Sequence, residues 1–310
     1  MHPQVSRRTL LRQAAGAAAA LLFPLPAVAC GSAPAPTGKT QRNPDRERLA
    51  WWTQRLTAEG LTRPDQPLGR SVARVGDLAA GSPYVPFTLE EYLRKGGTPA
   101  AEPLTLSLTR FDCVTLVEAC LAVSRAAGTP SPEWEEFGRE VERMRYRDGH
   151  RRGYASRLHY FSEWITDGAR RGLVRDLGTE LGGAEDARPL RFMTQHRAKY
   201  PALQDNGVFQ EIQRIERSLD ARPRRVIPTK RIPEVVERIQ TGDVLAFATG
   251  ISGLDVTHSA LAYRDEAQRL RVLHAPLSGG VVEVTRTTLP EYVAAIGHAT
   301  GILVARPLRV

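Results

Sequence analysis

Three side chains in this sequence, those of Cys113, His258 and His274, have the residue types and the chain order that thiol-dependent acyl chemistry requires. Cys113 follows Asp112, a good helix N-cap, and opens a mostly apolar run that continues to Cys120. A thiol at a helix N-terminus lies at the positive end of the helix dipole, which favours the thiolate, and the free backbone N–H groups there can bind an oxyanion. The pattern predicts a nucleophile at Cys113 if a base lies nearby. Taken alone, a cysteine is more often a buried structural thiol.

Two histidines, His258 and His274, lie on neighbouring predicted strands. If a three-residue loop at 265–267 joins the strands, the hairpin is centred on Glu266 and the two histidines lie directly opposite on one face, with Cβ atoms about 5 Å apart. A general base and the group that orients it need such a spacing. A loop of even length would instead send one of the rings to the other face.

Other roles for these residues are structural or metal-binding. His258 alone could be a half-buried strand residue, and Cys113 with both histidines could form a metal site, although no CxxC or HxxxH pair supports one. Cys113 and Cys120 cannot form a disulfide, because seven helical residues separate their Cα atoms by about 10.5 Å. Cys120 is therefore predicted to be a core residue. The sequence has no GxGxxG, P-loop or HExxH motif, which removes the usual signatures of dinucleotide, nucleoside triphosphate and zincin-type zinc sites.

The elements that must position these residues change in type along the chain. Helical spacing of apolar residues predicts helices at 45–59, 88–94, 112–127, 133–144, 160–169 and 208–218. Short segments rich in β-branched residues predict strands at 243–248, 257–263, 270–274, 281–285 and 302–306. Helices followed by a meander predict an α+β fold with an antiparallel sheet.

Composition indicates an ordinary globular protein. The 310 residues are 42% hydrophobic and 25% charged, which is enough apolar material for a substantial core, and residues 44–310 are predicted to form one domain. The net charge of +9 is scattered along the chain, so binding to nucleic acid is not predicted. The 3 cysteines cannot build a disulfide framework.

The N-terminus has the features of an export signal. Residues 1–29 contain the twin arginines Arg7 and Arg8 and a short apolar segment at 14–23. The residues around Cys30 are similar to a lipobox, which predicts lipidation of Cys30 and a flexible tether at 30–43. We therefore expect Tat export to the periplasm and anchoring to the membrane. The alternative is a soluble periplasmic or secreted protein.

Several segments of the chain resemble a known family, the N-acetylmuramoyl-L-alanine amidase-like family of the NlpC-type papain-like cell-wall cysteine hydrolases. The resemblance covers residues 81–307. Its motifs occur in the family's order, from the segment before the nucleophile through the nucleophile helix to the core strands. They are 81–90, 111–118, 156–164, 242–247, 253–259 and 273–275. Ala275, Pro276 and Leu277 depart from the small polar residues that are common at this point in the family.

The resemblance implies a papain-like fold in which a helical N-terminal half carries the nucleophile helix, packed on the antiparallel sheet. It implies cleavage of the amide between the muramic acid lactyl group and L-alanine, in peptidoglycan or muropeptides, through a thioester acyl-enzyme. Cys113 would be the nucleophile, His258 the base and then the acid, and His274 the orienting residue. The implied reaction needs no metal or other cofactor.

The resemblance also implies a set of substrate or oxyanion contacts, each of which has an ordinary structural alternative. Tyr84 corresponds to a tyrosine near the nucleophile, although it could equally be a buried ring with a satisfied hydroxyl. Arg157 and His159 are expected to contact the sugar or a stem carboxylate. Asp112 adjoins the nucleophile, and Asp255 would shape the loop before His258 or serve as a turn aspartate.

Three other functions remain open at this point. An endopeptidase of the same superfamily would cut after D-glutamate. A wall-binding lipoprotein without activity would leave Cys113 unreactive. A cysteine acyltransferase would pass the acyl group to an amine or alcohol in place of water.

Overall fold

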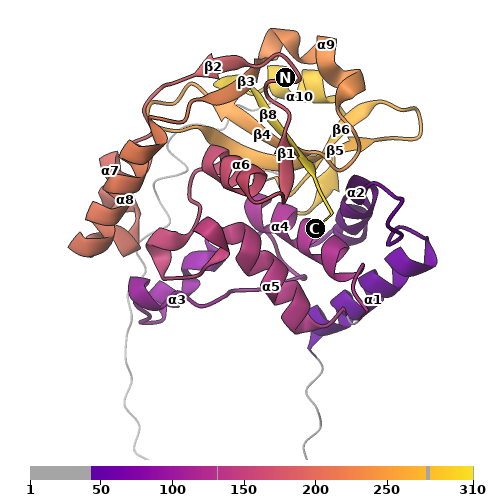
Figure 1. Ribbon diagram of the computed structural model, residues 1–310, viewed down its shortest axis with the longest axis horizontal. Coiled ribbons are helices and arrows are strands. Elements are labelled where there is room, and N and C mark those ends of the chain that lie inside the picture. Colours follow the sequence, from indigo (N-terminus) through magenta and orange to yellow (C-terminus); the bar gives the residue numbers. More distant parts are fainter. Residues whose placement is uncertain (1–42, 131, 277–279, 310) are drawn as a thin grey trace, which may run out of the picture. The chain divides into compact units, whose positions relative to one another are not determined.

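An antiparallel sheet of eight strands runs through the part of the chain that the structure describes (Figure 1). The structure is a computed structural model and describes residues 43–130, 132–276 and 280–309. The predicted signal, Cys30 and nearly all of the predicted tether lie outside these residues. No helix among the described residues is long and apolar enough to cross a membrane.

The strand order in the sheet is β2-β3-β8-β4-β5-β6-β7, and β1 also pairs with β8. All of these pairings are antiparallel. The prediction of an α+β fold with an antiparallel sheet is therefore confirmed. The strands are β1 Val174–Asp176, β2 Ala184–Asp186, β3 Arg224–Pro228, β4 Val244–Thr249, β5 Val256–Arg264, β6 Leu270–His274, β7 Glu283–Val284 and β8 Ala299–Pro307.

Helices pack on both faces of this sheet, and Figure 1 shows α1, α2, α4 and α5 on one side with α9 and α10 on the other. The α-helices are α1 Pro44–Ala58, α2 Leu68–Ala79, α3 Glu91–Arg94, α4 Cys113–Ala126, α5 Trp134–Arg145, α6 Phe161–Arg170, α7 Phe192–Gln195, α8 Asn206–Leu219, α9 Ile232–Val235 and α10 Leu289–Ala294. Because both faces are covered, the central strand β4 is buried along its whole length. Its alternate residues enter two separate cores: Ala246 packs with α4, and Phe247 packs with α10.

Helix α4 begins at Cys113 because its start is capped on both sides. The Asp112 carboxylate accepts a hydrogen bond from the Thr115 backbone N–H (2.8 Å), and the Thr115 hydroxyl accepts one from the Asp112 N–H (2.8 Å). This reciprocal capping box satisfies two backbone donors that the helix itself cannot satisfy. Behind the first turn the helix is buried all round, with Leu116 and Cys120 fully inaccessible to solvent. The prediction of Cys120 as a core residue is confirmed.

The hairpin formed by β5 and β6 differs in register from the prediction. The structure pairs Leu261 with Leu273 and Ala262 with Val272, so the turn is centred on Ala267 and not on Glu266. Gln268 takes the left-handed conformation at φ 60°, and its N–H donates to the Asp265 carbonyl (2.8 Å). The predicted loop length of three residues is thus right, but the loop starts one residue later in the chain.

This correction has a geometric consequence for the two histidines. Continued along the strands, the observed register places His274 across from Ala260, so His258 and His274 are diagonal neighbours and not directly opposite. The shift is by an even number of residues, which leaves both side chains on one face of the sheet. Diagonal neighbours on one face remain within reach of long or aromatic side chains.

The predicted helices and strands are all present, within a few residues at their ends. The segment predicted as a helix at 88–94 consists of a 3-10 turn, Thr88–Glu90, followed by α3. The prediction omitted α2, α7, α9 and α10 and the strands β1 to β3. Short elements such as α9 and β1 carry too few turns or alternations for a periodic pattern to appear.

Candidate active site

The two histidine rings form the geometric centre of the candidate site. Nε2 of His258 lies 2.8 Å from Nδ1 of His274, and the rings meet edge to face at 72°. The His258 ring stacks on Phe247, whose side chain lies on the same face of the sheet. Tyr292, from α10, brings its hydroxyl to 3.3 Å from Nδ1 of His274. Three elements of the fold, β5, β6 and α10, therefore meet at this pair of rings.

A break in the sheet precedes His258. The pairing of β4 with β5 passes from Phe247 opposite His258 to Ala248 opposite Val256, which leaves Thr257 as an extra, exposed residue. Such a bulge changes the direction of the neighbouring side chains and is common next to active sites. The bulge places His258 at the end of the regular ladder, where its ring is only partly covered.

Cys113 lies beside the residue that follows His258. The backbone N–H and the hydroxyl of Ser259 both act on the Cys113 thiol and lower its pKa, as does the N–H of Val114. The Ser259 hydroxyl is buried and has no other hydrogen-bond partner. The Cys113 residue is partly exposed. Helix α4 and strand β5 thus bring the predicted nucleophile next to Ser259, the residue that follows the predicted base in the chain.

The thiol and the imidazoles are neutral at pH 7 in this structure. Burial raises the pKa of Cys113 to about 11, and the Asp112 carboxylate acts in the same direction. Burial lowers the pKa of His258 to about 3, with a smaller contribution from His274, and lowers that of His274 to about 4. No hydrogen bond joins the sulfur to either ring among the described residues. The expected preference for the thiolate at the helix start is therefore outweighed by burial.

The start of α4 offers free donors next to the sulfur. The capping box uses the N–H of Thr115, and the N–H of Leu116 donates to the Asp112 carbonyl (3.1 Å). The N–H of Cys113 has no acceptor among the described residues, and that of Val114 faces the Cys113 sulfur. Unpaired N–H groups at a helix start are suited to an oxyanion.

Tyr84 lies close to this helix start. Its segment runs beside the residues before the nucleophile, with a parallel bridge from Tyr84 to Phe111 and a hydrogen bond from its N–H to the Gly280 carbonyl (2.8 Å). Burial, together with Cys113 and Asp112, raises the pKa of Tyr84 to about 12. The hydroxyl therefore remains protonated and able to donate a hydrogen bond, and no partner for it is found among the described residues. Of the predicted site residues, Tyr84, Asp112 and Cys113 lie together at the start of α4, and His258 and His274 form the pair of rings.

Arg157 is held by partners inside the protein. Its side chain is buried, and the residue is only 5% exposed. The guanidinium lies 2.7 Å from the Glu90 carboxylate and 3.5 Å from that of Glu102, and it stacks on the ring of Tyr154. These carboxylates raise the pKa of Arg157, because they favour its charged form. Arg157 thus ties together segments that are far apart in the chain.

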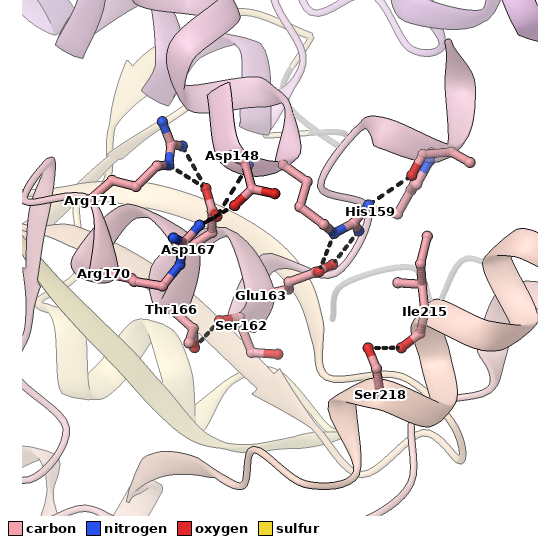
Figure 2. A network of polar contacts seen from close by, with 12 residues as sticks. Asp148, His159, Ser162, Glu163, Thr166, Asp167, Arg170, Arg171, Ile215 and Ser218 are labelled. Carbon is pink, nitrogen blue, oxygen red and sulfur yellow. Dashed lines mark hydrogen bonds and ion pairs between the residues drawn. The ribbon is translucent and has the colours of Figure 1, made fainter. Parts of the chain in front are cut away.

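His159 lies in the polar network around α6 that Figure 2 shows. Its Nε2 is 2.9 Å from the Tyr154 carbonyl, and burial and the charge of Arg157 lower its pKa. Nearby, Arg170 and Arg171 both pair with Asp167 on α6. Among the described residues, the contacts of His159 are therefore with Tyr154 and Arg157 and not with Cys113 or the two paired histidines.

Asp255 acts on the start of α6. Its carboxylate accepts hydrogen bonds from the Ser162 N–H (2.8 Å) and from the Val256 N–H (2.7 Å), and the residue is buried. A carboxylate at this position caps α6 from outside the helix and fixes the segment that leads into β5. That Asp255 shapes the loop before His258 stays a prediction.

Sequence reasoning missed Phe247, Ser259 and Tyr292 as members of the site. Ser259 and Phe247 lie on predicted strands, but only the observed register shows what they face. Tyr292 lies on α10, which was not predicted, and no local pattern indicates that it reaches His274. Within the described residues, no group of three or more His, Cys, Asp or Glu side chains is arranged to hold a metal ion.

Comparisons with known proteins give one matching family and several similar structures. The model of the N-acetylmuramoyl-L-alanine amidase-like family matches residues 74–301. A crystal structure of an N-acetylmuramoyl-L-alanine amidase from Bacteroides uniformis ATCC 8492 is 28% identical, with a TM-score of 0.70, over 78% of this chain and 99% of that one. A structure from Bacteroides fragilis, named provisionally as a xylanase, is 31% identical over 75% of this chain and 99% of that one, with a TM-score of 0.68.

A third structure resembles this chain in fold alone. Protein LPG0564 from Legionella pneumophila is 17% identical, with a TM-score of 0.60, over 85% of this chain and 94% of that one. A search of the curated proteins finds no match.

Proposed function

The chain belongs to the N-acetylmuramoyl-L-alanine amidase-like family, and from this membership we propose that it cleaves the amide between the muramic acid lactyl group and L-alanine, using Cys113 as the nucleophile. The observation that carries the cysteine mechanism is the arrangement at the end of β5. A hydrogen-bonded pair of imidazoles, His258 and His274, adjoins Ser259, which lies beside the sulfur. We also propose that the fold is of the papain-like, NlpC type.

The proton on the histidine pair decides how the base can work. A single proton lies between Nε2 of His258 and Nδ1 of His274, since only one of these atoms can donate to the other. If Nε2 of His258 carries it, Nδ1 of His258 has a free lone pair that can accept the thiol proton. His274 then receives the hydrogen bond at Nδ1 and carries its own proton on Nε2. This tautomer is the one that the mechanism requires.

The reaction then proceeds in two stages. Because thiol and imidazole start neutral, His258 removes the Cys113 proton as the sulfur attacks the amide carbonyl. The N–H groups at the start of α4 and the Tyr84 hydroxyl stabilise the oxyanion. His258 then protonates the nitrogen of the departing alanine, leaving a thioester between Cys113 and the lactyl group. Attack by water, deprotonated by His258, releases the lactyl carboxylate and restores the thiol.

Incubation of the purified protein with defined muropeptides, followed by mass spectrometry, tests this proposal. We expect free saccharide and a stem peptide that begins with L-alanine. The Cys113→Ala variant should lose activity by at least about a thousandfold. Cys120→Ala is the matched control, because it removes the other described thiol from the core of the same helix and should retain activity.

Two results would contradict the proposal. Hydrolysis by Cys113→Ala at the wild-type rate would exclude the cysteine mechanism. Products cut after D-glutamate would identify an endopeptidase instead of an amidase.

We further propose that the protein is exported through the Tat pathway and anchored to the membrane by an acyl group on Cys30. The support is the sequence alone: the twin arginines Arg7 and Arg8, the short apolar segment and the residues around Cys30. Labelling of cells with a radioactive fatty acid should mark the wild type and not the Cys30→Ser variant. An unlabelled wild type recovered in the soluble periplasmic fraction would favour the soluble alternative.

A further inference from the structure

One polar atom next to the proposed catalytic pair has no partner. His274 is fully buried, and its Nδ1 is occupied by Nε2 of His258 and lies near the Tyr292 hydroxyl. Its other nitrogen, Nε2, makes no hydrogen bond. A buried N–H without an acceptor costs free energy, so without an acceptor the tautomer of His274 that carries its proton on Nε2 is disfavoured. The proposed function nevertheless requires the proton at that atom.

The nearest carboxylate to this nitrogen comes from the next strand. β7 pairs with β6 in a register that sets Glu283 directly opposite His274, so both side chains leave the same face of the sheet. Oε1 of Glu283 lies 4.0 Å from Nε2 of His274. The Glu283 side chain is 49% exposed and therefore free to move by the roughly one ångström that a hydrogen bond requires.

Among the groups around His274, the Glu283 carboxylate is the available acceptor for the Nε2 proton. His258 on β5 and Tyr292 on α10 both approach Nδ1, on the other side of the ring. Cys113 on α4 acts on Tyr292, whose hydroxyl lies near Nδ1, and adjoins Ser259. Of these titratable neighbours, only Glu283 faces Nε2.

We propose that Glu283 is a positioning residue that accepts the Nε2–H of His274 and so fixes the tautomer in which Nδ1 of His258 is free to take the thiol proton. This inference rests on the proposed function, because it assigns a fourth member to the same site. Glu283 acts through two histidines and touches no reacting atom. Its negative charge also stabilises the positive charge that His258 acquires as the thiol loses its proton.

The most direct test observes the tautomer without substrate. Nitrogen-15 NMR of the histidine rings should show the His274 proton on Nε2 in the wild type. In Glu283→Ala the proton should be shared between Nδ1 and Nε2, while Glu283→Gln should keep the wild-type tautomer, since its amide oxygen can still accept. The control is Glu237→Gln, which removes a charge from a glutamate whose side chain is 85% exposed. It should leave the spectrum unchanged.

Kinetics supply a second measurement. If Glu283 had a purely structural role, its variants would not change kcat or the pH profile in the way described below. With muropeptide substrate, Glu283→Ala should lower kcat about tenfold and leave KM unchanged. Glu283→Gln should shift the acidic limb of the kcat/KM profile to lower pH, because loss of the carboxylate makes His258 harder to protonate. Glu237→Gln should leave both quantities unchanged.

Three outcomes are decisive. Wild-type tautomers and wild-type pH profiles in both Glu283 variants would overturn the inference. A tautomer change in Tyr292→Phe together with none in Glu283→Ala would overturn it as well, and would assign the positioning role to Tyr292. A wild type that hydrolyses no muropeptide but shows the expected tautomers would contradict the proposed function and leave the role of Glu283 supported.

Discussion

At the scale of single residues, burial sets the protonation states of the site. Desolvation destabilises the charged forms of Cys113 and of the two histidines, and their neighbours do not compensate for it. The thiol pKa is therefore high and the histidine pKa values are low. A neutral thiol beside a neutral imidazole differs from a preformed thiolate and imidazolium pair. The base must therefore remove the proton during attack, and the exact placement of the imidazole protons becomes important.

Asp112 offers a way to vary the thiol without moving it. Its carboxylate raises the pKa of Cys113, and one of its oxygens caps α4. The Asp112→Asn variant keeps an oxygen for the cap and removes the charge, so we expect a lower pKa of Cys113. The rate of alkylation by iodoacetamide, measured against pH, should rise at lower pH in this variant than in the wild type.

Asp112→Ala serves as the comparison for the cap itself. It removes both the charge and the capping oxygen, and should reduce the free energy of unfolding by about 1 kcal/mol. An alkylation profile of Asp112→Asn identical to that of the wild type would show that the carboxylate has no influence on the sulfur.

At the scale of elements, three pieces of secondary structure place the reactive groups. Helix α4 fixes Cys113 through its capping box, the bulge at Thr257 sets the direction of His258, and the β5–β6 hairpin holds the two rings on one face. The observed register differs from the predicted one by an even number of residues. The pairing of the rings survives for this reason, since an odd shift would have moved one histidine to the opposite face.

For the molecule as a whole, the sheet with helices on both faces excludes water from His274. Phe247 and α10 cover the rings on their face of the sheet, while α4 packs on the other face. A histidine that stays neutral when folded but binds a proton when unfolded makes stability depend on pH. His274, which is fully buried, should show this effect.

The free energy of unfolding should fall as the pH falls from 6.5 to about 4, because the pKa of His274 drops from 6.5 to about 4 on folding. Over this range the unfolded chain binds a proton that the folded chain cannot accept. The contribution of His274 is on the order of 3 kcal/mol and levels off below pH 4. Urea unfolding of the wild type and of His274→Asn at several pH values measures it. Parallel stability curves for the two proteins across this range would show that the burial of His274 does not affect acid stability.

The features that could be predicted from the sequence depend on residues close together in the chain. Asp112 is a good N-cap residue directly before an apolar run, which is why the start of α4 at Cys113 could be predicted. The alternation along each strand likewise predicted that His258 and His274 share a face, and the order of helices and strands predicted the fold class. These features follow from the periodicity of the backbone, which any short segment already expresses.

The contacts of the polar side chains could not be predicted, because they depend on the packing of distant segments. The partners of Arg157, Glu90 and Glu102, lie far from it in the chain, and Tyr292 reaches His274 from a helix that had not been predicted. The hairpin register was set by the left-handed conformation at Gln268, which a glycine would have indicated and a glutamine did not. Long-range contacts of this kind depend on how whole elements pack, and packing is a property of the complete core.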